Sequence, residues 1–134
     1  MGKGMNKNTS IETVKLIQGI GSKMNWNDRE NKQFVEAILT LKNTDEAECF
    51  LRDLMTEGEI KEFANRLEAA RLLSGDVQYN AIIESTGLSS ATIARIAKWL
   101  KGSLGGYRLI LSRLSNASLH HHNSSKIRKG LLLS

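Results

Sequence analysis

The sequence predicts an all-α protein. Its 134 residues contain no proline and only two Trp, two Tyr and three Phe, whereas Leu, Ile, Ala, Glu, Lys and Arg, which favour helices, are abundant. From residue 27 onward, apolar residues recur three or four positions apart, as on an α-helix with one buried face. Residues that commonly cap helix N-termini precede these periodic segments. The hydrophobic content of 40% is enough to supply a core, so the chain should fold.

The first predicted helix spans Asp28 to Leu41. Asn27, with Glu30 three residues later, forms an N-terminal capping pattern. The apolar face of this helix then comprises Phe34, Val35, Ile38, Leu39 and Leu41. Residues 1–26 mix Lys, Asn, Gly and Ser around a short apolar stretch, and they are predicted to form a flexible basic arm.

Two further helices are predicted before residue 76. Thr44 can cap a short second helix, because its hydroxyl can accept from a free amide of the first turn. Thr56 and Glu59 form a capping box for a third helix, predicted to be the longest, which ends at Gly75. Cys49, the single cysteine, is followed by apolar residues and is predicted to be a buried thiol. The short connections leave no room for a linker.

Residues 77–101 have the pattern of a helix-turn-helix. Gly87 separates two periodic segments and can adopt the positive φ that a tight turn between helices requires. Ser89 or Ser90 can cap the second helix of the pair. The residues predicted to point inward and hold the two helices together are Ile82, Leu88, Ile93 and Ile96. With this pair included, residues 27–114 are predicted to form one domain, followed by a disordered tail over residues 115–134.

Charge is distributed unevenly along the chain. Residues 28–76 carry seven Lys/Arg against twelve Asp/Glu, a net −5, whereas residues 77–114 carry five against one, a net +4. Because neutralised phosphates supply much of the affinity of proteins for DNA, the basic part is predicted to contact nucleic acid. The second helix of the pair would enter the major groove, which admits one α-helix. The residues predicted to contact DNA are Gln78, Ser89, Ser90, Thr92, Arg95, Lys98 and Lys101.

Several stretches resemble the Trp-repressor superfamily, in particular its Trp-repressor-related branch of the YerC/YecD type. They are Leu54-Met55-Thr56 with Glu59, Asn65-Arg66-Leu67-Glu68, Gly75, Thr86-Gly87 through Ala91-Thr92-Ile93-Ala94-Arg95, and Gly106-Tyr107-Arg108-Leu109-Ile110-Leu111. The resemblance implies a six-helix, Trp-repressor-like helix-turn-helix fold. It also implies an intertwined homodimer, in which two chains interlock through their first, second, third and last helices.

The same resemblance implies a pocket for an effector. The best-known member of the superfamily grips the carboxylate of L-tryptophan with arginine, and Thr56, Arg66 and Arg95 match pocket positions here. Trp99 stands where tryptophan-sensing members carry a serine, so its indole could fill the cavity. In addition, the stretch from Arg66 to Gly75 is one residue shorter than usual, which on a helix rotates a side chain by about 100°. We therefore expect an unknown small-molecule effector or none, and we do not expect L-tryptophan as corepressor or any other cofactor.

The sequence thus predicts a cytoplasmic transcriptional regulator, a repressor by its resemblance, which binds double-stranded DNA as a homodimer. The alternative is a helical protein–protein interaction module that uses the same pair of helices without sequence-specific DNA binding. An enzyme is not expected, because the sequence has no glycine-rich phosphate loop and no Cys or Ser paired with a histidine motif. His120, His121 and His122 lie in the polar tail without fixed geometry, so no metal site is predicted. No apolar run approaches the ~20 residues of a membrane span.

Overall fold

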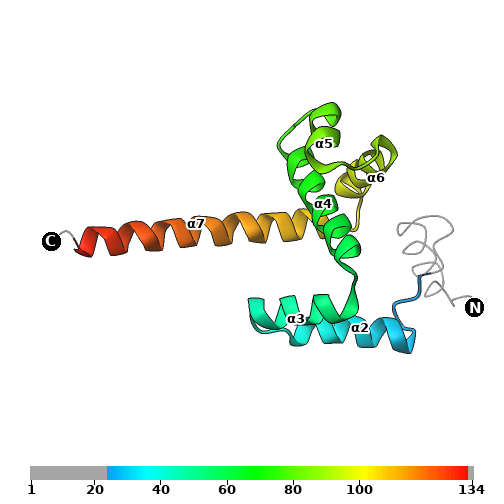
Figure 1. Cartoon of the computed structure of the whole chain (residues 1–134), viewed down its shortest axis with the longest axis horizontal. Coiled ribbons are helices and arrows are strands. Elements are labelled where there is room, and N and C mark those ends of the chain that lie inside the picture. Colours follow the sequence, from blue (N-terminus) through cyan, green and yellow to red (C-terminus); the bar gives the residue numbers. More distant parts are fainter. Residues whose placement is uncertain (1–23, 133–134) are drawn as a thin grey trace, which may run out of the picture. The chain divides into compact units, whose positions relative to one another are not determined.

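The computed structural model describes residues 24–132, and side chains up to residue 120; every regular element among them is an α-helix (Figure 1). The helices are α2 (Arg29–Thr40), α3 (Thr44–Leu54), α4 (Glu57–Ser74), α5 (Tyr79–Thr86), α6 (Ser90–Lys101) and α7 (Gly106–Leu132). Residues 24–132 contain six α-helices, which confirms the predicted six-helix, all-α fold for this part of the chain. Most of the predicted N-terminal arm, residues 1–23, lies outside the described residues.

The chain comprises two compact units, which divide within α4 between Glu62 and Phe63. The first unit contains α2, α3 and the first turns of α4, and the second contains the rest of α4 with α5, α6 and α7. A domain that begins at residue 27 and ends at 114 stays a prediction.

The N-termini of α2 and α3 differ by one residue from the prediction. Asp28, not Asn27, is the N-cap of α2, and its side chain accepts no bond from the first turn. Asn43, not Thr44, caps α3, because its side-chain oxygen accepts a hydrogen bond from the Glu46 amide at 3.0 Å. In both places adjacent residues can cap a helix, and spacing alone does not choose between them.

The first unit leaves most of its large apolar side chains exposed. Neither α2 nor α3 has a buried residue, and Phe34, Ile38 and Leu54 are 42%, 47% and 46% exposed. Cys49 is exposed as well, so the prediction of a buried thiol is wrong for this chain. The reason is that two short helices form too thin a layer to enclose either of their faces.

Helix α4 begins with the predicted capping box. The Thr56 amide donates to the Glu59 carboxylate at 2.9 Å, and the Glu59 amide donates to Thr56 Oγ1 at 3.2 Å. At the other end the helix stops at Ser74, as predicted, but the left-handed residue is Asp76 (φ 59°), not Gly75.

The end of α4 is a Schellman motif. The Asp76 amide donates to the Leu73 carbonyl and the Val77 amide donates to the Leu72 carbonyl, both at 3.1 Å. Two carbonyls of the last turn thereby gain partners before the chain turns into α5.

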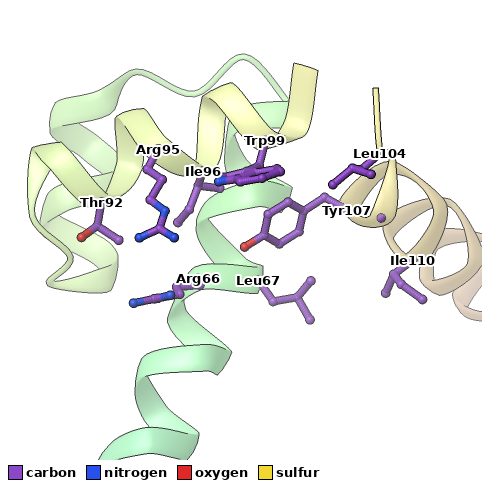
Figure 2. Close-up of a pocket in the computed structure, with 10 residues that line it drawn as sticks. Arg66, Leu67, Thr92, Arg95, Ile96, Trp99, Leu104, Tyr107 and Ile110 are labelled. Atoms are coloured by element: carbon purple, nitrogen blue, oxygen red, sulfur yellow. The ribbon is translucent and has the colours of Figure 1, made fainter. Parts of the chain in front are cut away.

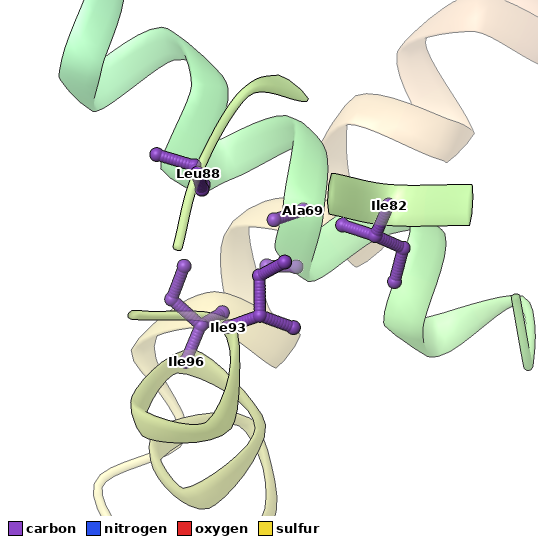
Figure 3. Packing of buried hydrophobic residues seen from close by; sticks show 6 residues of the cluster. Ala69, Ile82, Leu88, Ile93 and Ile96 are labelled. Carbon is purple, nitrogen blue, oxygen red and sulfur yellow. The ribbon is translucent and has the colours of Figure 1, made fainter. Parts of the chain in front are cut away.

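The core of the second unit lies where α4, α5 and α6 meet (Figure 3). Ile82 and Ile93 are fully buried there, and the small side chains of Ala69 and Ala70 leave α4 flat enough for close approach. Burial of a side chain of this size contributes about 1.5–3 kcal/mol. The prediction that Ile82, Leu88, Ile93 and Ile96 point inward is confirmed.

Helix α7 is the longest helix, with 27 residues against 18 in α4, so the prediction that the third helix is longest is wrong. It extends through residues 115–132, where the sequence predicted a disordered tail. The polar composition suggested a tail, yet neither glycine nor proline interrupts residues 107–129. Ser118 also donates to the Leu114 carbonyl one turn earlier, so it does not compete with the helix.

Candidate nucleic-acid interface

The turn between α5 and α6 has the predicted geometry. Gly87 adopts the left-handed conformation (φ 71°, ψ 6°), and its amide donates to the Ile83 carbonyl at 2.8 Å. Thr86 is buried beside it, where Oγ1 donates to the Ile82 carbonyl at 2.6 Å and accepts from the Leu88 amide at 3.3 Å. The one buried hydroxyl in the described core therefore ties the end of α5 to the start of the turn.

Helix α6 begins at a well-formed cap. Ser89 has extended backbone and accepts a hydrogen bond from the Thr92 amide at 3.2 Å. Of the two serines that sequence left open as caps, Ser89 fills the role and Ser90 is the first helical residue. The two hydroxyls of Ser89 and Thr92 lie 2.9 Å apart and form a hydrogen bond with each other.

One face of α6 packs against the core and the other is exposed. Ile93, Ile96 and Ala97 are buried in the core, whereas Arg95 and Lys98 are exposed. Ala91 and Ala94 are small and exposed between the charged side chains, so the backbone of α6 is accessible to a partner. The remaining predicted contact residues are also exposed, except for the partly buried Thr92: Gln78 at the N-cap of α5, Ser89, Ser90 and Lys101.

The exposed face of α6 is purely cationic in formal charge. Between Ser85 and residue 120 the chain carries five Lys/Arg and no Asp or Glu. Sequence reasoning missed Tyr79, which is 43% exposed in the first turn of α5, close along the chain to Gln78. Its place next to Gln78, at the start of the first helix of the pair, was the available signal.

A cavity of about 560 Å³ lies in the second unit beside α6. Figure 2 shows Arg95 extending from α6 toward Arg66 on α4, while the Trp99 indole of α6 lies near the Tyr107 ring of α7. The cavity is lined by Arg66, Leu67, Thr92, Arg95, Ile96, Trp99, Leu104, Gly106, Tyr107 and Ile110.

Three of the four predicted effector-pocket residues therefore line one cavity: Arg66, Arg95 and Trp99. Thr56 is not among the lining residues; it caps α4 in the first unit. The shorter spacing after Arg66 does not remove its side chain from the cavity, where its guanidinium carbon is 5.4 Å from the centre of the Phe63 ring. The Trp99 indole forms a wall and leaves the cavity open instead of filling it.

The chemistry of this cavity suits an anion. Two guanidinium groups and the Tyr107 hydroxyl face the same space, and none of the described residues that line it is acidic. Arginine presents a planar set of donors that matches the geometry of carboxylate and phosphate. Tyr107 was not predicted as a pocket residue, although it belongs to the Gly106-Tyr107-Arg108 stretch that carried part of the resemblance.

A separate ion pair lies on α4. Arg71 donates to both carboxylate oxygens of Glu68, at 2.8 and 2.6 Å. These hydrogen bonds lower the pKa of Glu68 below its usual value, which partial desolvation opposes, and they raise the pKa of Arg71. The pair is largely exposed and stabilises the helix only modestly.

The fold and the exposed α6 define a helix-turn-helix protein. The chain belongs to the Trp repressor protein family, whose sequence pattern matches residues 29–115. Its members are regulators rather than enzymes.

One named relative and two solved structures agree with this assignment. YerC of Bacillus subtilis strain 168, described as an uncharacterized protein, is 38% identical over 86 residues, which cover 64% of this chain and 83% of YerC. A TrpR-like protein from Eubacterium eligens shares 37% identity with a TM-score of 0.63, over 67% of this chain and 93% of that protein. A candidate Trp repressor from Staphylococcus aureus shares 35% identity with a TM-score of 0.58, over 63% and 84%.

The matched region ends well before α7 does. The family pattern stops at residue 115, whereas the helix continues to Leu132. Within residues 24–132, no helix has the combination of length and apolar character that crossing a membrane requires.

Proposed function

We propose that this protein is a sequence-specific DNA-binding transcriptional regulator, acting as a repressor, in which α6 reads the major groove. The observation that carries the proposal is the orientation of α6: its isoleucines are buried, while its cationic residues are exposed together with Ala91 and Ala94. A helix with one such face can enter a groove without any rearrangement of its own unit. We expect such a regulator in the cytoplasm.

The predicted DNA-contacting side chains differ in the kind of contact that each can make. Lys98 and Lys101 lie in the last turns of the helix, where an ammonium can pair with a phosphate as a point charge. Arg95 can make the bidentate contact with a guanine edge that gives base specificity. Gln78, Ser89, Ser90 and Thr92 lie at the N-terminal ends of α5 and α6 and supply further donors and acceptors. Arg95 also lines the cavity, so an occupant there can change how this side chain is presented to DNA.

The salt dependence of binding to a duplex tests this assignment. We expect log affinity to fall linearly with log salt, and Lys98→Gln with Lys101→Gln to lower the slope by about 2, because each phosphate contact adds about 0.9. The matched control is Lys42→Gln with Lys61→Gln, which removes the same charge from exposed positions of the acidic region and should leave the slope unchanged. If the affinity for the duplex barely changes with salt, phosphate contacts do not drive binding. That result would favour the alternative of a protein-interaction module.

We further propose that the protein is a homodimer. In one chain α2 and α3 bury no residue, and α7 exposes Leu109 and Leu114 by about half. A second copy would cover such apolar surface. The two helix-turn-helix pairs, one from each chain, would then bind half-sites about 34 Å apart. Light scattering coupled to size exclusion should give twice the mass of the chain at micromolar concentration. The mass of a single chain under those conditions would contradict the dimer.

The cavity is proposed as the site of a small anionic effector other than free L-tryptophan. Arg66 and Arg95 supply the positive charge, and the Trp99 indole forms one wall of the cavity, at the position where tryptophan-sensing members are expected to carry a serine. Calorimetric titration should show no tight, stoichiometric binding of L-tryptophan. Such binding, abolished by Arg66→Ala, would contradict this part of the proposal.

A further inference from the structure

The C-terminal end of α6 is closed by a side chain from α7. The last four carbonyls of any α-helix lack partners within the helix. Here the Gly102 amide donates to the Trp99 carbonyl at 3.1 Å, and the guanidinium of Arg108 donates through Nη1 to the Leu100 carbonyl at 2.6 Å. A cation at this end also interacts favourably with the helix dipole. Arg108 therefore bonds to the helix that we propose as the DNA-reading element.

Gly105 makes room for this contact. It has a positive φ of 70°, and a Cβ at this position would lie 3.1 Å from Nη2 of Arg108. Its carbonyl accepts from the Leu109 amide at 3.0 Å, which begins α7. The backbone conformation at this position favours glycine, and a Cβ added there would displace the guanidinium by a few tenths of an ångström.

On the basis of the proposed function, we propose that Arg108 is a positioning residue that fixes the C-terminal end of α6 for DNA binding. The N-terminal end of α6 is fixed by the bond between Ser89 and the Thr92 amide, and its middle by Ile93 and Ile96. Lys98 and Lys101 lie in the last turns, next to the carbonyl that Arg108 holds. Loss of the bond lets this end fray, and the two ammonium groups then lose their fixed direction.

The competing role is a direct phosphate contact, since Arg108 is exposed and belongs to the acid-free part of the chain. The two roles differ in salt dependence. A phosphate contact adds about 0.9 to the slope of log affinity against log salt, whereas a positioning bond within the protein adds nothing itself.

The test compares Arg108→Gln with Lys101→Gln in the full chain. The DNA is a duplex selected from genomic fragments with the purified protein. We expect Arg108→Gln to weaken binding to this duplex about tenfold, the typical loss for one charge-assisted hydrogen bond. The slope of log affinity against log salt should stay unchanged. Lys101→Gln should lower the slope by about 1. Arg108→Lys keeps a cation that can reach a carbonyl, so it should restore part of the affinity.

A readout without DNA separates positioning from DNA contact. In a Trp26→Phe background the fluorescence reports Trp99 alone, whose carbonyl lies in the same final turn. Arg108→Gln should shift its emission to longer wavelength, and Arg113→Gln, which removes the same charge from the same helix, should not. Gly105→Ala should give the same shift, and the double variant should add little to either single change.

Two results would overturn the inference. One is a slope lowered by about 1 in Arg108→Gln with unchanged Trp99 emission, which assigns the side chain to phosphate. The other is unchanged affinity and emission together. If the parent protein does not bind DNA at all, the proposed function fails, while the emission of Trp99 still decides whether Arg108 holds α6.

Discussion

Replacement of Gly87 by alanine tests the turn between α5 and α6. The residue has a φ of 71°, and a Cβ added there would meet no atom within 4 Å. Steric overlap with neighbours therefore contributes nothing, and the cost comes only from holding an L-residue in the left-handed conformation. That cost is about 1–2 kcal/mol for alanine, and less for asparagine, which tolerates this conformation better.

Urea unfolding at fixed protein concentration measures this effect, because the stability of a dimer depends on concentration. Gly87→Ala should lower the free energy of unfolding by about 1–2 kcal/mol, and Gly87→Asn by less. Asp76→Gly is the matched control: it places glycine at a position with a φ of 59° and should raise stability by up to about 1 kcal/mol. Equal stability of Gly87→Ala and the parent would refute the assigned turn.

Three further predictions concern the elements that support α6. Ser89→Ala removes the cap of α6 and should cost about 1 kcal/mol of unfolding free energy, measured in urea; no loss would mean that water replaces the hydroxyl without cost. Ile93→Ala opens a cavity at a fully buried position and should cost about 2–5 kcal/mol by the same measurement, whereas a loss below 1 would place Ile93 outside the core. Because the pKa of Glu68 is lowered in the folded protein, the pair with Arg71 stabilises above the ordinary pKa of a glutamate and loses this effect as pH falls through the lowered value. Glu68→Gln should therefore flatten the acid-side fall in stability measured across a pH series, and an unchanged profile would contradict the pair's role.

The region from α4 to α6 was largely predictable from sequence. Isoleucines at helical spacing on both sides of Gly87 specify which face is buried, and one glycine specifies where the chain turns. The capping box of Thr56 and Glu59 was recognisable for the same reason: its hydrogen bonds join residues three positions apart. Interactions of this kind depend only on local geometry.

Features that depend on contacts between distant residues were less predictable. The cavity joins side chains of α4, α6 and α7, and only the family resemblance suggested Arg66 and Arg95 together. The role of Arg108 depends on a bond to a carbonyl eight residues earlier, in another helix, which no periodic pattern encodes. The apolar faces of α2 and α3 were recognised from their spacing, but a single chain does not bury them.

Chemical probing of the major groove tests the central claim most directly. Dimethyl sulfate methylates guanine N7, which lies in that groove, and selected genomic fragments supply duplexes for the assay. We expect protection of N7 at two positions about one helical turn apart, and weaker binding of Arg95→Ala by about 1–3 kcal/mol. Tight binding without N7 protection, or with full protection by a variant in which Lys98, Lys101 and Arg95 are all replaced, would show that α6 does not enter the groove.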